Sequence, residues 1–366
     1  MLKLDIFLIL GYNILKNCFE RSEIFMYTDY VSDLLESLCY ANGTSGDESD
    51  AANFAAEKLG EFMNVSIDKL GNVVGRNEAE GKHFLLDAHI DRIGLVVTAI
   101  TDDGFLKVGA CGGIDVRTLD AAEVIVYGTE PIFGVITAIP PHLSKSDENK
   151  ASDITDILID IGMDKETAER FITPSDRVIV KPQFSKLLSS RVVGTALDDR
   201  AGVVSLLLAC KLLKENGNLP NLTVVFSVCE ETTGSGAKTT SFKASADEAI
   251  AVDVSFALQP GVSPEESGEL SKGPMIGFSS TLDFSMSKKL VSVAEKNEIP
   301  YQKEIMGSRT GTNADSIAVS GQGVKMGLLS IPQRNMHTQA EIIDINDVIN
   351  TAKLIAGYIS CRMEEC

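Results

Sequence analysis

Four short apolar runs, separated by segments with helical spacing, constrain the fold of this chain most strongly. Each run has the length of a β-strand and is nearly continuous in its apolar character. The runs are HFLLDA (83–88), TVVFSV (223–228), AIAVDV (249–254) and MGLLSI (326–331). Continuous runs that alternate with helices are typical of a parallel or mixed sheet buried on both faces. We therefore predict an α/β fold.

Apolar residues three and four positions apart predict the helices between these runs. The helical positions are Val31, Leu34, Leu35 and Leu38; Phe54, Ala55, Leu59 and Phe62; residues 200–216, closed by Gly217; and Val348, Ala352, Ile355 and Ile359. Each set lines one face of a helix, so we expect these faces to cover the sheet.

The segment 96–190 has a different pattern from the rest of the chain. It contains short apolar stretches with Gly and Pro between them and one expected helix near DKETAERF (164–171). Such spacing predicts a small β-rich domain. We expect it to be inserted into a discontinuous catalytic domain formed by 27–95 and 191–366. Residues 1–26 are expected to be an extension outside the fold, because their interrupted apolar block is too short for a bilayer and lacks a small-residue cleavage site.

Charge and cysteine content restrict the partners and the compartment. The net charge of −19 disfavours nucleic acid or an anionic membrane surface as partner, because the field of the protein would repel either. Seven scattered cysteines without a CxxC pair indicate a reducing compartment, so we expect a cytoplasmic protein. Cys229 is an alternative catalytic nucleophile, but its acidic neighbours would raise the pKa of the thiol.

Acidic residues and histidines follow the four apolar runs. In open α/β sheets the carboxyl ends of the strands form the ligand-binding edge, so residues far apart in sequence can meet there. His89 and Asp91 are two positions apart and would share one face of a strand. Taken alone, this pair fits a core histidine bonded to a nearby acid better than it fits a metal site. The other residues at this edge are Glu230, Glu231, Asp253 and His337, with Asp198 and Asp199 before the helix of 200–216.

These residues fit a two-metal hydrolytic site. Histidine and carboxylate together suit zinc, cobalt or manganese better than calcium or magnesium. Two cations roughly 3.5–4 Å apart need a bridging carboxylate, terminal ligands and a free carboxylate as base. The predicted ligands are His89, Asp198, Glu231, Asp253 and His337, and the predicted base is Glu230. Asp199 is left as a ligand alternative or as the cap of the following helix.

Seven motifs in order resemble the tetrahedral (TET-type) glutamyl aminopeptidase-like zinc metallopeptidases, some of which are labelled cellulase M or endoglucanase. The resemblance extends from about Tyr27 to the C-terminus. Its motifs are GTSGDE (43–48), AHIDRIG (88–94), ALDDRAG (196–202), CEETTGSGA (229–237), VDVSFA (252–257), KGPMIG (272–277) and SIPQRNMHTQAE (330–341).

The resemblance implies a role for each site residue. His89 and Asp253 would be terminal ligands, and Asp198 would bridge the two metals. Glu231 and His337 would complete the site, with Glu230 as general base. Asp91 would be the acid that orients the ring of His89.

The resemblance also implies an architecture and an activity. The fold would be a zinc-peptidase three-layer α/β/α domain with an inserted PDZ-like or barrel domain that mediates dimers, assembled into a homododecamer. The activity would be release of N-terminal residues from short peptides by water activated by two divalent ions, Zn²⁺ or Co²⁺ in first place and Mn²⁺ as a further option.

Departures from the family pattern leave the preferred N-terminal residue open. Arg92 stands where relatives carry an acid, and TTGSGA, Asn335 and GTNADS also differ from the usual motifs. Two other functions remain as alternatives, a non-catalytic peptide-binding or scaffold relative and an endoglucanase. The second is disfavoured because sugar clefts use aromatic platforms, whereas this chain has no tryptophan and 6% aromatic residues.

Three further residues have bland expected roles. His83 is expected at the surface, and His142 in a loop of the inserted domain. Arg200 is expected to hold Asp199 in place.

Overall fold

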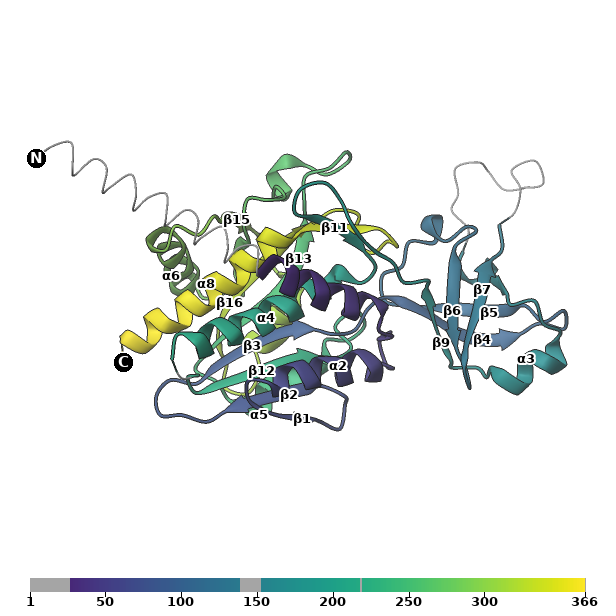
Figure 1. Cartoon of the computed structure of the whole chain (residues 1–366), viewed down its shortest axis with the longest axis horizontal. Helices are drawn as coiled ribbons and strands as arrows, with labels where there is room; N and C mark the ends of the chain where they lie inside the picture. Colours follow the sequence, from purple (N-terminus) through teal and green to yellow (C-terminus); the bar gives the residue numbers. More distant parts are fainter. Residues whose placement is uncertain (1–26, 139–152, 218, 366) are drawn as a thin grey trace, which may run out of the picture.

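The structure is a computed structural model that describes residues 27–138, 153–217 and 219–365 (Figure 1). The expected N-terminal extension and His142 lie outside these described residues. Within the described ranges, no helix combines the length and the apolar character needed to cross a membrane.

An eight-stranded mixed sheet forms the centre of the larger part of the molecule. The four predicted runs are its neighbouring central strands β12, β3, β13 and β16, and each lies parallel to the next. The α/β prediction is therefore confirmed. In spatial order the strands are β1 (Asn64–Ile67), β2 (Val73–Asn77), β12 (Leu222–Ser227), β3 (Phe84–His89), β13 (Glu248–Phe256), β16 (Lys325–Gln333), β14 (Met275–Phe278) and β15 (Gln302–Ile305).

Helices cover both faces of this sheet and make a three-layer arrangement. The larger core lies under the helix of residues 27–40 and under α2 (Ser49–Gly60), α4 (Leu197–Glu215), α6 (Phe284–Lys296) and α8 (Ile345–Glu364). The opposite core lies under α5 (Ser235–Ala244) and α7 (Asn313–Ala318). The predicted apolar faces at 31–38 and 348–359 are buried in the larger core, as expected for helices that pack on a sheet.

A closed barrel with a core of its own lies beside the sheet (Figure 1). Its strands, in order around the barrel, are β4 (Gly94–Ile100), β5 (Leu106–Cys111), β8 (Leu158–Asp160), β7 (Pro131–Ile136), β6 (Glu123–Tyr127) and β9 (Arg177–Val180), with α3 (Lys165–Phe171) in the same segment. The described elements also include three short 3₁₀ helices, η1 (Val116–Thr118), η3 (Ile154–Asp156) and η4 (Pro264–Glu266).

The last barrel strand ends ten residues before the boundary expected from the sequence, since β9 ends at Val180 and that boundary was residue 190. The next strands, β10 (Phe184–Lys186) and β11 (Arg191–Gly194), pair with each other, and β11 also pairs with β17 (Glu341–Asp344), so neither strand joins the barrel. Local apolar spacing predicts a strand but not its partner, and the second partner of β11 lies far along the chain.

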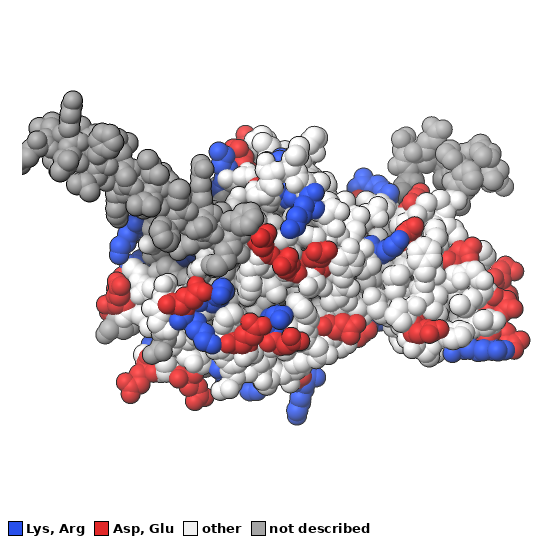
Figure 2. All heavy atoms as spheres, in the orientation of Figure 1, with Lys and Arg blue, Asp and Glu red and all other residues white. Residues whose placement is uncertain are grey.

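Charged side chains are spread over both parts of the molecule. Figure 2 shows acidic side chains on the sheet part and at the outer end of the barrel, with basic side chains among them. The exclusion of polyanionic partners stays a prediction from the net charge.

Candidate metal centre

The carboxyl ends of three adjacent parallel strands carry the predicted ligands. His89 is the last residue of β3, Asp253 lies in β13, and Glu230 and Glu231 follow β12. Asp198 comes from the irregular start of α4. These side chains and His337, from the segment after β16, line one open cleft of about 490 Å³. The structure thus brings the five predicted ligands and the predicted base together.

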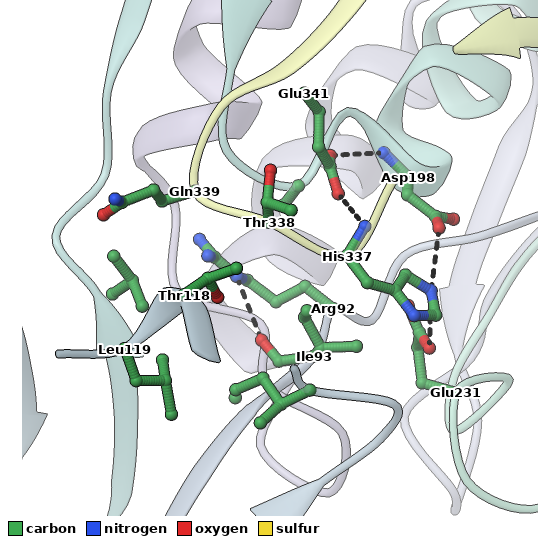
Figure 3. A pocket seen from close by; sticks show the side chains of 14 residues that line it. Arg92, Ile93, Thr118, Leu119, Asp198, Glu231, His337, Thr338, Gln339 and Glu341 are labelled. Carbon is green, nitrogen blue, oxygen red and sulfur yellow. Dashed lines mark hydrogen bonds and ion pairs between the residues drawn. The ribbon is translucent and has the colours of Figure 1, made fainter. Parts of the chain in front are cut away.

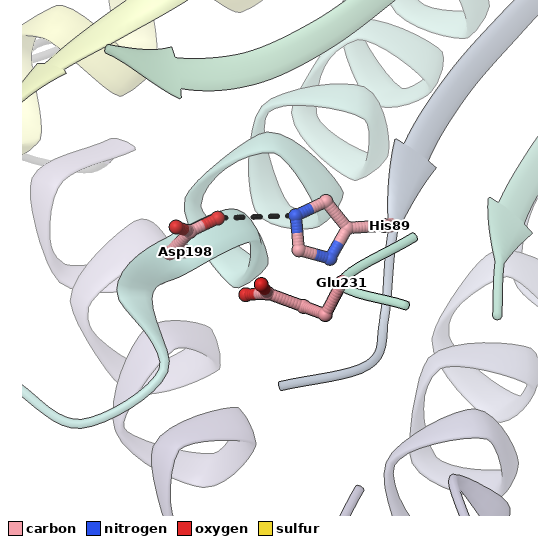
Figure 4. Close-up of side chains that lie close together, drawn as sticks. All are labelled: His89, Asp198 and Glu231. Atoms are coloured by element: carbon pink, nitrogen blue, oxygen red, sulfur yellow. Dashed lines mark hydrogen bonds and ion pairs between the residues drawn. The ribbon is translucent and has the colours of Figure 1, made fainter. Parts of the chain in front are cut away.

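Asp198 lies between two histidines and presents one carboxylate oxygen to each. Its Oδ1 is 3.0 Å from Nε2 of His89 (Figure 4), and its Oδ2 is 3.1 Å from Nε2 of His337 (Figure 3). A second acid accompanies each histidine. Asp253 Oδ1 lies 3.9 Å from Nε2 of His89, and Glu231 Oε2 lies 3.4 Å from Nε2 of His337. Two histidine–carboxylate groups therefore share one carboxylate.

The crowding of acids at this site favours bound positive charge. Burial raises the pKa of Glu231 to about 8, and burial also raises the pKa values of Asp253 and Glu230. The hydrogen bond to Asp198 raises the pKa of His337 to about 9. Burial alone would raise the pKa of Asp198, but the bonds with the two histidines lower it. Such a cluster must retain protons unless cations take their place, so the donor set fits divalent metal ions.

Asp199 belongs to the same surroundings and serves as the helix cap. Its Oδ1 accepts the Gly202 backbone N–H at 3.0 Å, whereas its buried Oδ2 has no hydrogen-bond partner among the described residues. One ligand group with all donor atoms within 4.8 Å of one another consists of His89, Asp198 and Glu231, and a second of His89, Asp199 and Asp253. All three residues of the first group are predicted ligands. The second group contains two predicted ligands, His89 and Asp253, together with Asp199.

Asp91 contacts more than the histidine that the sequence assigned to it. The Nδ1 atom of His89 lies 3.1 Å from the Asp91 carbonyl oxygen and 3.4 Å from Oδ1 of its carboxylate. That carboxylate also accepts the backbone N–H groups of Glu230 at 3.0 Å and Glu231 at 3.2 Å, and the Ser45 hydroxyl at 2.5 Å. Asp91 thus fixes the turn that carries two other site residues.

Two expectations about neighbouring residues are corrected by the structure. Arg200 donates hydrogen bonds to the carbonyl oxygens of Leu38 and Ala41 instead of bonding to Asp199, because the irregular start of α4 turns it toward the first described helix. His83 is only half-exposed, and its Nε2 lies 2.8 Å from the Thr223 hydroxyl oxygen.

The surroundings of Cys229 disfavour a role as nucleophile. Burial raises the pKa of its thiol to about 11, and its sulfur lies 3.5 Å from a carboxylate oxygen of Glu48. Glu48 also accepts the Cys229 backbone N–H at 3.3 Å. Sequence reasoning did not identify Glu48 as a contact of this turn. It also did not identify Glu341, which accepts the backbone N–H groups of Asp198 and His337. Their places inside two of the quoted motifs were the available signal.

Comparison with known proteins gives this fold and site a class. Solved structures with a similar fold include aminopeptidases. The model of the M42 glutamyl aminopeptidase family matches residues 71–354, so the chain belongs to that family.

Individual relatives agree with this assignment. The lysyl aminopeptidase of Pyrococcus furiosus is 36% identical, over 89% of this chain and 96% of its own length. An aminopeptidase structure from Desulfurococcus kamchatkensis has a TM-score of 0.85 at 32% identity, over 91% of this chain and 95% of that one. A TET peptidase of Pyrococcus horikoshii, described as able to assemble into a tetrahedron or a large octahedral shell, has a TM-score of 0.80 at 31% identity, over 89% and 98% of the two chains.

Proposed function

We propose that this protein is a metal-dependent aminopeptidase that releases N-terminal residues from short peptides with the help of two divalent cations. The observation that carries the proposal is the position of Asp198, whose two oxygens face two separate histidine–carboxylate groups. Membership of the M42 glutamyl aminopeptidase family supports the reaction class.

Each cation would have its own histidine and acid. His89 and Asp253 would hold one ion, Glu231 and His337 the other, and Asp198 would bridge them. Zn²⁺, Co²⁺ or Mn²⁺ bound there would polarise the scissile carbonyl and make a bound water more acidic. We prefer His337 to Asp199 as a ligand because Asp199 already caps α4.

Glu230 would move the proton. It lines the cleft beside the ligands, and burial raises the pKa of its carboxyl group, the direction that favours a general base. The carboxylate would take a proton from the attacking water and deliver it to the amine of the leaving peptide. Asp91 would keep this base in place through the Glu230 backbone N–H.

The walls of the cleft suggest how the substrate lies. The free α-amine of a peptide is a cation, and the carboxylates at the floor would attract it. Phe256, Met336 and Val254 give the cleft an apolar side for the first side chain. The described residues that line the cleft include no Lys or Arg to pair with an acidic side chain.

Assembly is part of the proposal. We propose a homo-oligomer in which barrels pair into dimers and dimers build a dodecamer. A dodecamer is described for one similar solved structure, PhTET1-12s. The barrel strands from Gly94 to Val180 would form the dimerisation domain. Such a shell would admit short peptides and exclude folded proteins.

The test is hydrolysis of aminoacyl-anilides by chelator-stripped protein that is resupplied with zinc, cobalt or manganese. We expect metal-restored cleavage, with leucyl and lysyl anilides cleaved faster than the glutamyl anilide because the cleft wall lacks a cation. The Glu230→Gln variant is the control for contaminating peptidases. Folded protein that cleaves no substrate with any metal would contradict the proposal and favour a peptide-binding relative. A preference for the glutamyl anilide would contradict the substrate argument alone.

A further inference from the structure

Glu341 is a buried carboxylate that the mechanism above does not use. It is the first residue of β17 and is 2% exposed. Its Oε1 accepts the backbone N–H of His337 at 3.1 Å, and its Oε2 accepts the backbone N–H of Asp198 at 3.2 Å (Figure 3). One side chain therefore links the main chains of two proposed metal ligands that are far apart in sequence.

Neither of these main chains is held by regular secondary structure. His337 has a φ of 60°, in the left-handed region that non-glycine residues rarely adopt. Asp198 has non-helical φ and ψ of −79° and 107° at the start of α4. A backbone N–H in such a place has no partner from a helix or a ladder, and leaving it unpaired when buried is costly. The carboxylate of Glu341 supplies both missing acceptors.

The main chain of Glu341 is itself fixed between the two ligand segments. On one side Glu341 pairs with Gly194 at the end of β11, which leads directly to Asp198. On the other side, Arg334 and Ile342 exchange backbone hydrogen bonds of 2.9 and 3.1 Å, which closes the loop that contains His337. The side chain is thus anchored between the two segments that it joins.

A buried positive charge accompanies this buried carboxylate. Arg92 is 4% exposed and lines the same small cavity, of about 20 Å³, together with Glu341 and both ligands (Figure 3). Its Nη1 has no hydrogen-bond partner among the described residues. The charge of Arg92 favours the ionised form of Glu341, against the larger opposing effects of burial and of Asp198.

We propose that Glu341 is a positioning residue that sets the separation of the two metal half-sites by holding Asp198 and His337 in one frame. The inference rests on the metal ligands assigned under the proposed function. It predicts an asymmetry between the half-sites. One ion would be held by Asp198, Glu231 and His337, and two of these ligands, Asp198 and His337, depend on Glu341. The ion held by His89 and Asp253 depends on Glu341 only through the bridging carboxylate of Asp198.

The test compares Glu341→Gln with Asp347→Asn, a matched control at a residue that lines neither the cleft nor the small cavity. Asp347 is fully buried, and its two oxygens accept the backbone N–H groups of Ser271 at 2.8 Å and Gly273 at 2.7 Å. Both substitutions remove one acceptor from a side chain that links two backbone amides. Chelator-stripped full-length proteins are titrated with Co²⁺, with visible absorption and bound cobalt per chain as readouts and thermal unfolding as a check of folding.

We expect two bound cobalt ions in the wild type and in Asp347→Asn, although Asp347→Asn unfolds at a lower temperature. Glu341→Gln should keep one ion at wild-type affinity and bind the second about 10–100-fold more weakly, the usual effect of losing a group that orients a ligand. If Glu341→Gln does not fold, Glu341→Asp decides, because its shorter side chain cannot reach both amides and should weaken the same ion.

Two results would overturn the inference. One is two ions at unchanged affinity in the Glu341 variants, and the other is an equal loss of cobalt in Asp347→Asn. A wild type that binds no cobalt would refute the metal site of the proposed function and this inference with it. A wild type that binds two ions and cleaves no anilide would refute the aminopeptidase activity but leave the cobalt comparison valid.

Discussion

Replacing Asp91 with Asn tests whether one carboxylate organises this site. The fully buried Asp91 carboxylate accepts hydrogen bonds from the backbone N–H groups of Glu230 and Glu231 and from the Ser45 hydroxyl, and it faces Nδ1 of His89. Asparagine has nearly the same shape but only one acceptor oxygen. The substitution therefore changes hydrogen bonding and charge with little change in packing.

The size of the effect follows from counting acceptors. An amide nitrogen in place of Oδ1 leaves the Glu230 N–H without a partner, and in place of Oδ2 it leaves the Glu231 N–H without one. Either orientation orphans one buried donor, which costs about 1–3 kcal/mol. The Ser45 hydroxyl can rotate to accept instead, so it adds little. We expect Asp91→Asn to lower the free energy of unfolding by about 2 kcal/mol.

The assay is urea unfolding of metal-free protein together with anilide kinetics of the metal-loaded protein. Because the orphaned donor belongs to the turn that carries the proposed base, kcat should fall about 10–100-fold with a smaller change in KM. Ser45→Ala is the control, since it removes one donor to Asp91 and orphans no backbone N–H. An Asp91→Asn protein within about 0.5 kcal/mol of the wild type and with unchanged kcat would refute this account.

Two further predictions concern other acids. Glu230→Gln should retain both metals by elemental analysis and lose about 10²–10⁴-fold in kcat, and high residual activity would remove Glu230 from the role of base. Burial alone would raise the pKa of Glu248, but bonds from Arg362, Lys82 and Tyr358 lower it from 4.5 to about 2. The stability from this ionisation is present above pH 4.5 and is lost as the pH falls toward 2, up to about 3 kcal/mol. The free energy of unfolding of Glu248→Gln should therefore differ from that of the wild type most near pH 7 and least in acid. A difference that does not change with pH would contradict this.

The sequence predicted the sheet because its central strands are buried on both faces. HFLLDA and AIAVDV have almost no polar positions, and they became β3 and β13 in the middle of the sheet. The same reasoning could not decide where the barrel ends. The strand at 177–180 pairs within the barrel, whereas the strand at 191–194 pairs with β17, far along the chain. Strand pairing is a property of distant residues, so short segments do not encode it alone.

The sequence predicted the ligand residues of the site better than the hydrogen bonds that hold those residues in place. Histidines and acids at strand ends show their function by residue type, and the cluster around Asp198 contains the predicted set. Residue type does not reveal the contacts that support the site, because these contacts join side chains to backbone N–H groups. The error about Arg200 has the same cause, since its adjacency to Asp199 in sequence said nothing about the carbonyl groups it reaches.

The support of this site combines irregular backbone with buried negative charge. Cys229 and His337 adopt left-handed φ values of 58° and 60°, a conformation that costs a non-glycine residue about 1–2 kcal/mol. The N–H groups in and beside these turns are accepted by the carboxylates of Glu48, Asp91 and Glu341. Carbonyl oxygens would satisfy the same donors without adding charge. Here carboxylates accept these hydrogen bonds, so the groups that hold the irregular backbone also raise the attraction of the site for cations. Ligand geometry and metal affinity therefore depend on the same side chains.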